Sequence, residues 1–238
     1  MAYSAGLGQN CIGMTNNRPP KGKRSGSSAR WLARQRKDPF VRKAATDGRV
    51  SRAHFKLAQL DERCRLLQPG MRVLELGAAP GGWTGYVESC IRMKSSTRDG
   101  LLVACDFREI SADQATVVVR GTLGEPQTAE LINVALGNQP VDLVLSDMAS
   151  NISGIRAADQ ALAMELAALA VAAVQQWLKP GGSFVVKIFQ GEGIDDWVRD
   201  MRKMFVNFRL IKPPASRAES REMYAVAKQF RRTRLLSP

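Results

Sequence analysis

Short apolar runs alternate with segments of helical periodicity along most of the chain. Runs rich in Val, Ile, Leu and Phe predict strands at 71–77, 100–106, 115–121, 141–147, 183–189, 208–212 and 223–230. Apolar residues at helical spacing predict helices at 82–93, 126–136, 157–178 and 194–205. Strands that alternate with helices are typical of a doubly wound α/β fold with a parallel sheet. Because no helix separates the last two strands, we expect a seven-stranded, mostly parallel sheet whose last strand is antiparallel.

The segment that precedes these runs has another pattern. Residues 1–29 are rich in Gly, Ser, Asn and Pro, which predicts a flexible basic arm. Residues 30–67 predict short basic helices, one of them over 53–67. Another helix has Asp38 as its N-cap and Pro39 in its first turn. We therefore expect a single domain over 30–238, with 30–67 as its basic helical part.

The charge of the chain indicates a polyanionic partner. Its formal net charge is +13 and its pI is about 10.1. No basic amphipathic helix with a broad apolar face is evident, so nucleic acid is favoured over a membrane surface. The basic side chains that we expect to contact phosphates are Lys21, Lys23, Arg24, Arg30, Arg34, Arg36, Lys37, Arg42, Lys43, Arg49 and Arg52. Trp31 and Phe40 recur at helical spacing with apolar neighbours, which favours core anchors over base-stacking platforms.

The number and spacing of cysteines and histidines limit the kinds of site that the chain can form. The four cysteines are scattered without a C-x-x-C pair, and His54 is the only histidine. This argues against a zinc site and a disulfide framework, and it fits a reducing, cytoplasmic location. We interpret His54 as a packing or RNA-facing residue. No apolar run approaches the length expected of a membrane span; the richest, 161–178, carries Glu165 and favours a buried helix.

A glycine-rich loop and two acids follow predicted strands. In doubly wound sheets ligands bind at the carboxyl ends of the strands, where glycines let backbone N–H groups approach closely. The loop that holds Gly77, Gly81 and Gly82 lacks the dinucleotide spacing G-x-G-x-x-G. Asp106 ends the second strand, where a carboxylate can accept the two hydroxyls of a ribose. The alternative is that the glycines only make a tight turn and that Asp106 caps the chain.

Lys187 lies inside a strand that reads as buried on both faces, in "SFVVKIF". Burying its charge costs several kcal/mol unless it is paired, neutralised or able to reach water. Asp147 follows the fourth strand in "LSDMASN". This turn lacks the Pro-Pro-aromatic sequence of amine methyltransferases and the cysteine of base-carbon methyltransferases. If the cofactor is S-adenosylmethionine, the acceptor is therefore neither an amine nor a ring carbon.

Several ordered motifs share one resemblance. They are "RWL" (30–32), "SRAHFKL" (51–57), "LGAAPGGW" (76–83), "ACD" (104–106), "SDMASN" (146–151), "PGGSFVVKIFQGEG" (180–193) and "SRAESREMY" (216–224). Over about residues 24 to 231 the chain resembles the FtsJ-like family of large-subunit ribosomal RNA methyltransferases, uridine 2′-O-methyltransferases with a Rossmann-like fold. The resemblance implies S-adenosylmethionine as cofactor and 23S ribosomal RNA in the large subunit as partner. A monomer is our default expectation.

The resemblance also implies the site residues. The family's catalytic set maps onto Lys56, Asp147, Lys187 and Glu222. Its cofactor contacts map onto Gly81, Trp83, Asp106 and Asp147, and the glycine loop adds Gly77. The family usually has an acidic residue after the third strand that contacts the adenine. Here that turn carries Thr122, which leaves a hydroxyl or a backbone N–H for this contact.

Lys187 is the group that we expect to accept the proton of the 2′-hydroxyl, while Lys56 fixes that hydroxyl and the two acids orient the lysines. A lysine that stays charged and only steers the oxygen is the alternative, since an unperturbed lysine titrates near ~10.4. Three rival functions remain open. They are the same chemistry on a transfer RNA or a messenger cap, a non-catalytic ribosome assembly factor, and a nicotinamide enzyme, which the glycine spacing disfavours.

Overall fold

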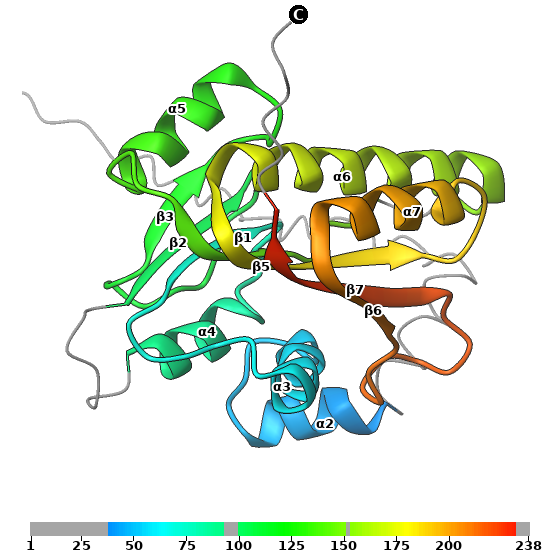
Figure 1. Ribbon diagram of the computed structural model, residues 1–238. Coiled ribbons are helices and arrows are strands. Elements are labelled where there is room, and N and C mark those ends of the chain that lie inside the picture. Colours follow the sequence, from blue (N-terminus) through cyan, green and yellow to red (C-terminus); the bar gives the residue numbers. More distant parts are fainter. Residues whose placement is uncertain (1–37, 93–99, 151–152, 232–238) are drawn as a thin grey trace, which may run out of the picture. The chain divides into compact units, whose positions relative to one another are not determined.

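The computed structural model describes residues 38–92, 100–150 and 153–231. Seven strands form one sheet in the order β3-β2-β1-β4-β5-β7-β6 (Figure 1). The strands are β1 (Arg72–Leu76), β2 (Leu101–Asp106), β3 (Val117–Arg120), β4 (Val141–Ser146), β5 (Leu178–Phe189), β6 (Phe205–Ile211) and β7 (Glu222–Phe230). Only β7 runs opposite to its neighbours, because it pairs antiparallel with both β5 and β6. The predicted seven-stranded sheet with an antiparallel last strand is confirmed.

Helices cover both faces of this sheet. They are α2 (Pro39–Thr46), α3 (Ala53–Cys64), α4 (Thr84–Ile91), α5 (Pro126–Ala135), α6 (Arg156–Trp177) and α7 (Ile194–Met204). Helices α5, α6 and α7 pack on one face, and α3 and α4 on the other, each around its own apolar cluster (Figure 1). The predicted arm, 1–29, and its boundary with the domain lie outside the described residues.

Helix α2 begins as its sequence predicts. The Asp38 side chain accepts hydrogen bonds from the backbone N–H groups of Phe40 (3.0 Å) and Val41 (3.4 Å), and Pro39 occupies the first turn. Phe40 is half-buried and lies 5.8 Å from the ring of Phe55, measured between centroids. Phe40 therefore packs on Phe55 but belongs to neither core cluster, so the expectation of a core anchor is not confirmed for Phe40, while Trp31 lies outside the described residues.

Strand β5 is longer than its apolar run. The expected strand began at Ser183, after a helix stop at 179–182, but the observed strand begins at Leu178. Leu178 is buried and pairs with Val141, and Ser183 pairs with Leu143, so the extra residues between them form an irregular bulge. Helix α6 ends before Lys-Pro-Gly-Gly, as predicted. However, these four residues are part of β5 and not a connection that precedes the strand.

Helix α6 contradicts the expectation that no apolar run approaches the length of a membrane span. It has 22 residues and contains an 18-residue window with a mean hydropathy of 1.5, so by length and composition alone it could cross a membrane. In the structure one side of α6 packs on β4 and β5 through small or apolar residues such as Ala167, Ala170 and Val174. Only 28% of this window is buried. The expectation of a buried helix therefore holds for one side of α6 only.

The carboxyl ends of the parallel strands bring the candidate residues to one edge of the sheet. Strand β2 lies on one side of β1 and β4 on the other, so the strand order changes direction between β1 and β4. Ligands of doubly wound folds bind at such a switch point. Gly77 follows β1 and Asp147 follows β4, and the backbone N–H of Asp147 donates to the carbonyl of Leu76 (3.1 Å). Asp106 ends the neighbouring strand β2.

Candidate active site

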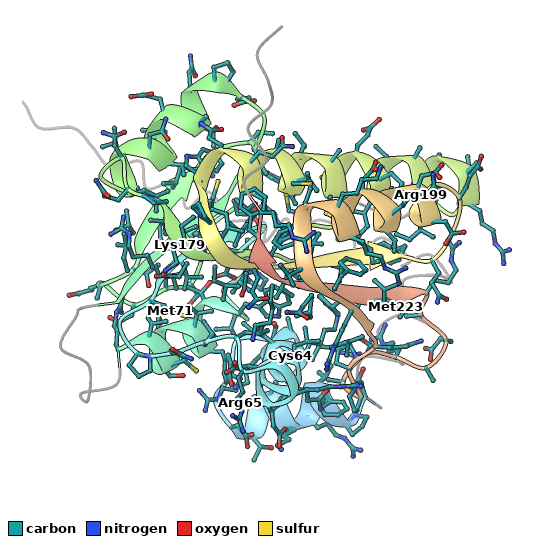
Figure 2. The ribbon with its side chains drawn as sticks, in the orientation of Figure 1. Cys64, Arg65, Met71, Lys179, Arg199 and Met223 are labelled. Carbon is teal, nitrogen blue, oxygen red and sulfur yellow. The ribbon has the colours of Figure 1, made fainter. Side chains whose placement is uncertain are left out.

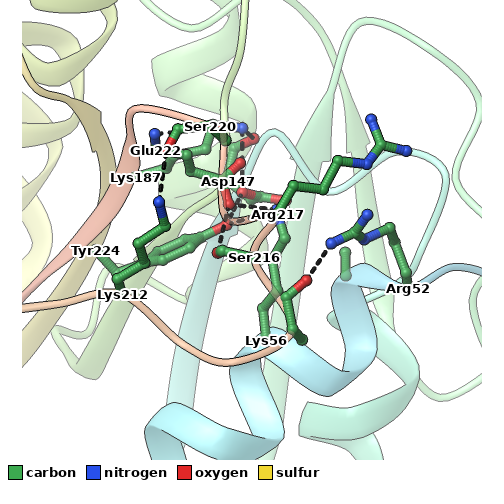
Figure 3. A network of polar contacts seen from close by, with 12 residues as sticks. Arg52, Lys56, Asp147, Lys187, Lys212, Ser216, Arg217, Ser220, Glu222 and Tyr224 are labelled. Atoms are coloured by element: carbon green, nitrogen blue, oxygen red, sulfur yellow. Dashed lines mark hydrogen bonds and ion pairs between the residues drawn. The ribbon is translucent and has the colours of Figure 1, made fainter. Parts of the chain in front are cut away.

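Two lysine–carboxylate pairs meet above this switch point (Figure 3). Lys187 Nζ on β5 lies 3.1 Å from Asp147 Oδ1 and donates to the backbone carbonyl of the same residue at 2.7 Å. Lys56 Nζ on α3 lies 2.6 Å from Glu222 Oε1 at the start of β7. The four residues that the resemblance implied therefore come together from four separate segments of the chain.

Tyr224 joins the two pairs into one network, and the sequence analysis did not single it out. Its hydroxyl donates to Asp147 Oδ1 at 2.9 Å and lies 3.3 Å from Lys56 Nζ, which donates to it. Burial raises the pKa of Tyr224 well above its ordinary value, and the charge of Asp147 adds to this rise. The phenol therefore stays protonated at neutral pH. No local pattern marks this residue, because its place in the network follows from its pairing with Lys187 across β5 and β7.

The side chain of Lys187 is buried beside an acidic partner, Asp147, which offsets the cost of burying its charge. The Lys187 side chain is only 7% exposed, so its ammonium does not snorkel into water. Its two polar contacts among the described residues are both with oxygens of Asp147, and an amine nitrogen has room for a third partner. One position on Lys187 Nζ thus remains for a further partner.

The loop between β6 and β7 is fastened to α3 beside the network. Ser216 donates to Glu222 Oε1 at 2.8 Å, and the backbone N–H of Ala215 donates to Gln59 Oε1 at 2.8 Å. Arg52 donates to the carbonyl of Ala215 and forms an ion pair with Asp38. The expectation of a phosphate contact for Arg52 is wrong, because its guanidinium is held in these internal contacts.

A pocket opens on the other side of Asp147, over the ends of β1 and β2. Its lining includes Leu76, Gly77, Asp106, Thr122, Leu123, Met148, Leu166 and Leu169. Gly77 and Asp106 thus line the same pocket. Gly81, Trp83 and Asp147 are not part of this lining. The Trp83 indole is buried, donates to the carbonyl of Ala53 at 2.9 Å and packs 5.6 Å from the Tyr224 ring.

The glycine loop after β1 tolerates no side chain at two positions. Gly77 and Gly81 have φ angles of +71° and +111°, in the region that favours glycine. A Cβ on Gly81 would lie 2.1 Å from the carbonyl oxygen of Ser111, and one on Gly77 would lie 2.7 Å from the Met148 side chain. The close approach of backbone segments therefore requires both glycines.

Asp106 is a buried carboxylate at the rim of this pocket. It accepts hydrogen bonds from the backbone N–H groups of Ala79 (3.0 Å) and Arg108 (2.9 Å), and from Arg108 Nε (3.2 Å). Burial alone would raise the pKa of Asp106, but the hydrogen bonds from Arg108 and Ala79 outweigh burial and lower it. The group is therefore ionised at neutral pH, and its only described side-chain partner is Arg108.

Glu75 is a second residue that the sequence analysis missed. It lies on β1 beneath the glycine loop, is 1% exposed, and accepts a hydrogen bond from the Thr84 hydroxyl at 2.9 Å. Burial raises the pKa of Glu75 to about 8, and the nearby charge of Asp147 contributes to the rise. By contrast, His54 is buried against Phe55 and Tyr86, as expected of a packing residue.

The fold and this edge of the sheet define an α/β methyltransferase, in which a ligand pocket adjoins a lysine–carboxylate network. A model described as FtsJ-like methyltransferase matches residues 49–230. The chain is 44% identical over 208 residues to the Pseudomonas aeruginosa protein named ribosomal RNA large subunit methyltransferase E, covering 87% of this chain and 98% of that protein. A protein of the same name from Stenotrophomonas maltophilia is 47% identical over 203 residues, or 85% of this chain and 94% of that one.

A solved structure has the same fold. A crystal structure of a Plasmodium falciparum protein described as a ribosomal RNA methyltransferase superposes with a TM-score of 0.67 at 23% identity. It covers 76% of this chain and 97% of that protein. On the family model and the two relatives together, the chain belongs to the FtsJ-like methyltransferase family.

Proposed function

We propose that the protein transfers a methyl group from S-adenosylmethionine to the ribose 2′-hydroxyl of a uridine in large-subunit ribosomal RNA, within the assembled large subunit. One observation carries the proposal. Lys56 and Lys187 converge through Asp147, Glu222 and Tyr224 beside a pocket at the carboxyl ends of β1 and β2. The name of the relatives supports the substrate, and the net charge of +13 supports an RNA partner.

The pocket has the chemistry that this cofactor needs. Asp106 offers an ionised, buried carboxylate to ribose hydroxyls, and the leucine and methionine side chains offer an apolar wall to a base. Thr122 lies in this wall, where its hydroxyl or N–H can meet the polar edge of an adenine. Of the two glycines, Gly77 lies in this lining, where its backbone faces the pocket without a side chain. When bound, S-adenosylmethionine supplies an electrophilic methyl group on a sulfonium.

Lys187 is the residue that we assign to the acceptor oxygen. A 2′-hydroxyl is a poor nucleophile until its proton is being removed, and a positioned side chain that removes it typically contributes about 10²–10⁴-fold. As the neutral amine, Lys187 donates its two N–H groups to the two Asp147 oxygens and turns its lone pair to the hydroxyl. The proton moves to this lone pair as the oxygen attacks the methyl group, and Asp147 neutralises the ammonium that forms. Lys56, held by Glu222 and Tyr224, orients the same hydroxyl from the side of α3. Holding the acceptor in place accounts for much of the rate, because effective molarities can be worth about 7–11 kcal/mol.

Helix α2 and the turn after it supply the RNA face of the described residues. Arg42, Lys43 and Arg49 are exposed there, and Lys43 Nζ lies 5.1 Å above the ring of Phe55. Phe55 directly precedes Lys56, so this basic surface adjoins the network. We assign backbone phosphate contacts to these three residues, together with the basic residues of 21–37.

The test uses radiolabelled S-adenosylmethionine. The protein is incubated with assembled large ribosomal subunits, protein-free ribosomal RNA and transfer RNA, and each RNA is digested to nucleosides. We expect label on the ribose of uridine, and most of it with the assembled subunit. Label on a base, or on transfer RNA only, would contradict the proposal, and so would an absence of label on all three. A protein carrying Asp106→Asn serves as the cofactor-binding control.

A further inference from the structure

A basic pocket lies at the far end of α3 from Lys56. It is lined by the last residues of α3 and by β6 and β7, and has a volume of about 350 Å³. The cationic residues in its lining are Arg63, Arg65, Arg209 and Lys228, and no acidic residue lines it. Figure 2 shows Cys64 and Arg65 at the end of α3. We call this feature the α3 end pocket.

Three of its cations have no acidic partner among residues 38–92, 100–150 and 153–231. No ion pair involves Arg63, Arg65 or Arg209 there, although all three are exposed. Asp61, one turn back on α3, instead accepts hydrogen bonds from the backbone of Leu66 and from the Tyr86 hydroxyl. Outside the described ranges the sequence contains one acidic side chain, Asp99.

Lys228 forms the floor of the pocket. Its ammonium donates to the backbone carbonyls of Cys64 (2.9 Å) and Arg65 (3.4 Å), which ties β7 to the end of α3. The guanidinium groups around it stay available for a ligand. Because like charges gathered without a counter-charge repel one another, an anion bound between them removes an unfavourable interaction. Arginine forks match the oxygens of a phosphate in a bidentate manner.

The α3 end pocket and the catalytic network share one face of the sheet. Tyr224 and Lys228 are four residues apart on β7 and point to the same face, which separates them by about 13 Å. Arg63 follows Lys56 by seven residues on α3, about two turns or about 10 Å along the helix. Since phosphates recur along each RNA strand, one RNA segment with its ribose at Lys187 can reach both places.

We propose that the α3 end pocket binds a backbone phosphate of the RNA substrate, a few nucleotides away from the ribose that is methylated. This rests on the proposed function for the identity of the RNA. The contacts to the phosphate come from Arg63, Arg65 and Arg209. Lys228 joins β7 to the end of α3 and so fixes the position of the pocket. The pocket thereby increases the affinity for the RNA and fixes the position of the RNA along the protein, without contact to the reacting atoms.

The experiment compares Arg63→Gln/Arg209→Gln with wild type and with Arg199→Gln/Arg202→Gln. The control pair removes the same charge from α7, which packs on the opposite face of the sheet (Figure 2). Binding to large-subunit ribosomal RNA is measured by filter retention across a range of salt concentrations. We expect about tenfold weaker binding for the pocket variant at moderate salt. The slope of log K against log salt should fall in magnitude by about 0.7–0.9 for each lost contact.

Kinetics separate the pocket from the reaction. With the proposed substrate, the pocket variant should show a raised KM for RNA and an unchanged kcat at saturating RNA. Equal affinity and salt slope in the pocket variant and wild type would overturn the proposal, as would an equal loss in the α7 control. A wild-type protein that binds the RNA without methylating it overturns the proposed function instead, and the binding comparison still decides the role of the pocket. Thermal unfolding of each variant, together with the two single substitutions, identifies any loss caused by misfolding.

Discussion

The hydroxyl of Tyr224 and the ammonium of Lys187 share one oxygen, Asp147 Oδ1, at 2.9 Å and 3.1 Å. Tyr224 also accepts from Lys56, so the two lysines are connected through a single phenol that stays protonated. The position of Lys187 Nζ therefore depends on a carboxylate whose own orientation depends on Tyr224. This relationship makes the network one unit rather than two separate ion pairs.

Removing the Tyr224 hydroxyl should misplace both lysines. In Tyr224→Phe the ring still packs on Trp83, but Asp147 and Lys56 each lose a hydrogen bond. A hydrogen bond to a charged group is worth about 1.5–3 kcal/mol, so we expect kcat to fall by about 10- to 100-fold with little change in cofactor affinity. Single-turnover methylation and calorimetric titration with S-adenosylmethionine measure the two effects. Tyr86→Phe, which removes a hydroxyl bonded to Asp61 on α3, is the control and should retain activity.

Substitutions of Lys187 distinguish proton removal from steering. Lys187→Ala should lower kcat by about 10²–10⁴-fold, because the acceptor loses its base and its anchor. Lys187→Arg keeps a positive charge beside Asp147 but does not accept a proton at neutral pH. We expect it to be as inactive as the alanine variant if Lys187 removes the proton. Substantial turnover by Lys187→Arg, with normal cofactor binding, would assign Lys187 to steering instead.

Arg108 is predicted to compete with the cofactor for Asp106. Its guanidinium occupies the carboxylate oxygens that would accept ribose hydroxyls, although its side chain is 57% exposed. An exposed ion pair is worth about 0–1 kcal/mol, so Arg108→Leu should tighten S-adenosylmethionine binding by no more than about fivefold. Calorimetric titration measures this. Arg120→Gln, whose side chain has the Phe107 carbonyl as its only hydrogen-bond partner among the described residues, should bind as wild type does. Weaker binding by Arg108→Leu would show that Arg108 assists the cofactor.

The sequence predicts the sheet and two of the four catalytic candidates, Asp147 and Lys187, because these leave local signals. Asp106 and Asp147 follow apolar runs, and strand ends of a parallel sheet must meet at one edge. Lys187 stands out as a charge within such a run. Lys56 and Glu222 carry no local signal, and only the family resemblance places them in the site.

Other features depend on tertiary contacts that no local pattern reveals. Tyr224 looks like an ordinary strand residue until β7 is placed next to β5, and Arg108 looks like a loop residue until it turns back onto Asp106. Arg52 resembles its exposed basic neighbours, yet the loop around Ala215 takes up its guanidinium. The start of β5 was misplaced because Lys-Pro-Gly-Gly is a helix-stop pattern, whereas pairing of Leu178 with Val141 extends the strand.

The buried carboxyl of Glu75 should make the stability of the cofactor-free protein depend on pH. Its pKa is about 8 in the folded chain and near 4.5 ordinarily, so the fold favours the protonated form. The stability that this group contributes is therefore fully present below about pH 4.5. It is lost as pH rises toward 8, by up to about 1.4 kcal/mol per pH unit.

Glu75→Gln removes this titration while its amide oxygen can still accept the Thr84 hydroxyl. We expect the variant and wild type to have similar free energies of unfolding near pH 5. At pH 9 the variant should be more stable by about 2–4 kcal/mol, since it buries no charge. Urea unfolding between pH 5 and 9 measures the difference, with the exposed Glu62→Gln as control. Parallel pH curves for wild type and Glu75→Gln would show that Glu75 is ionised in the folded protein at neutral pH, with a counter-charge that stabilises it.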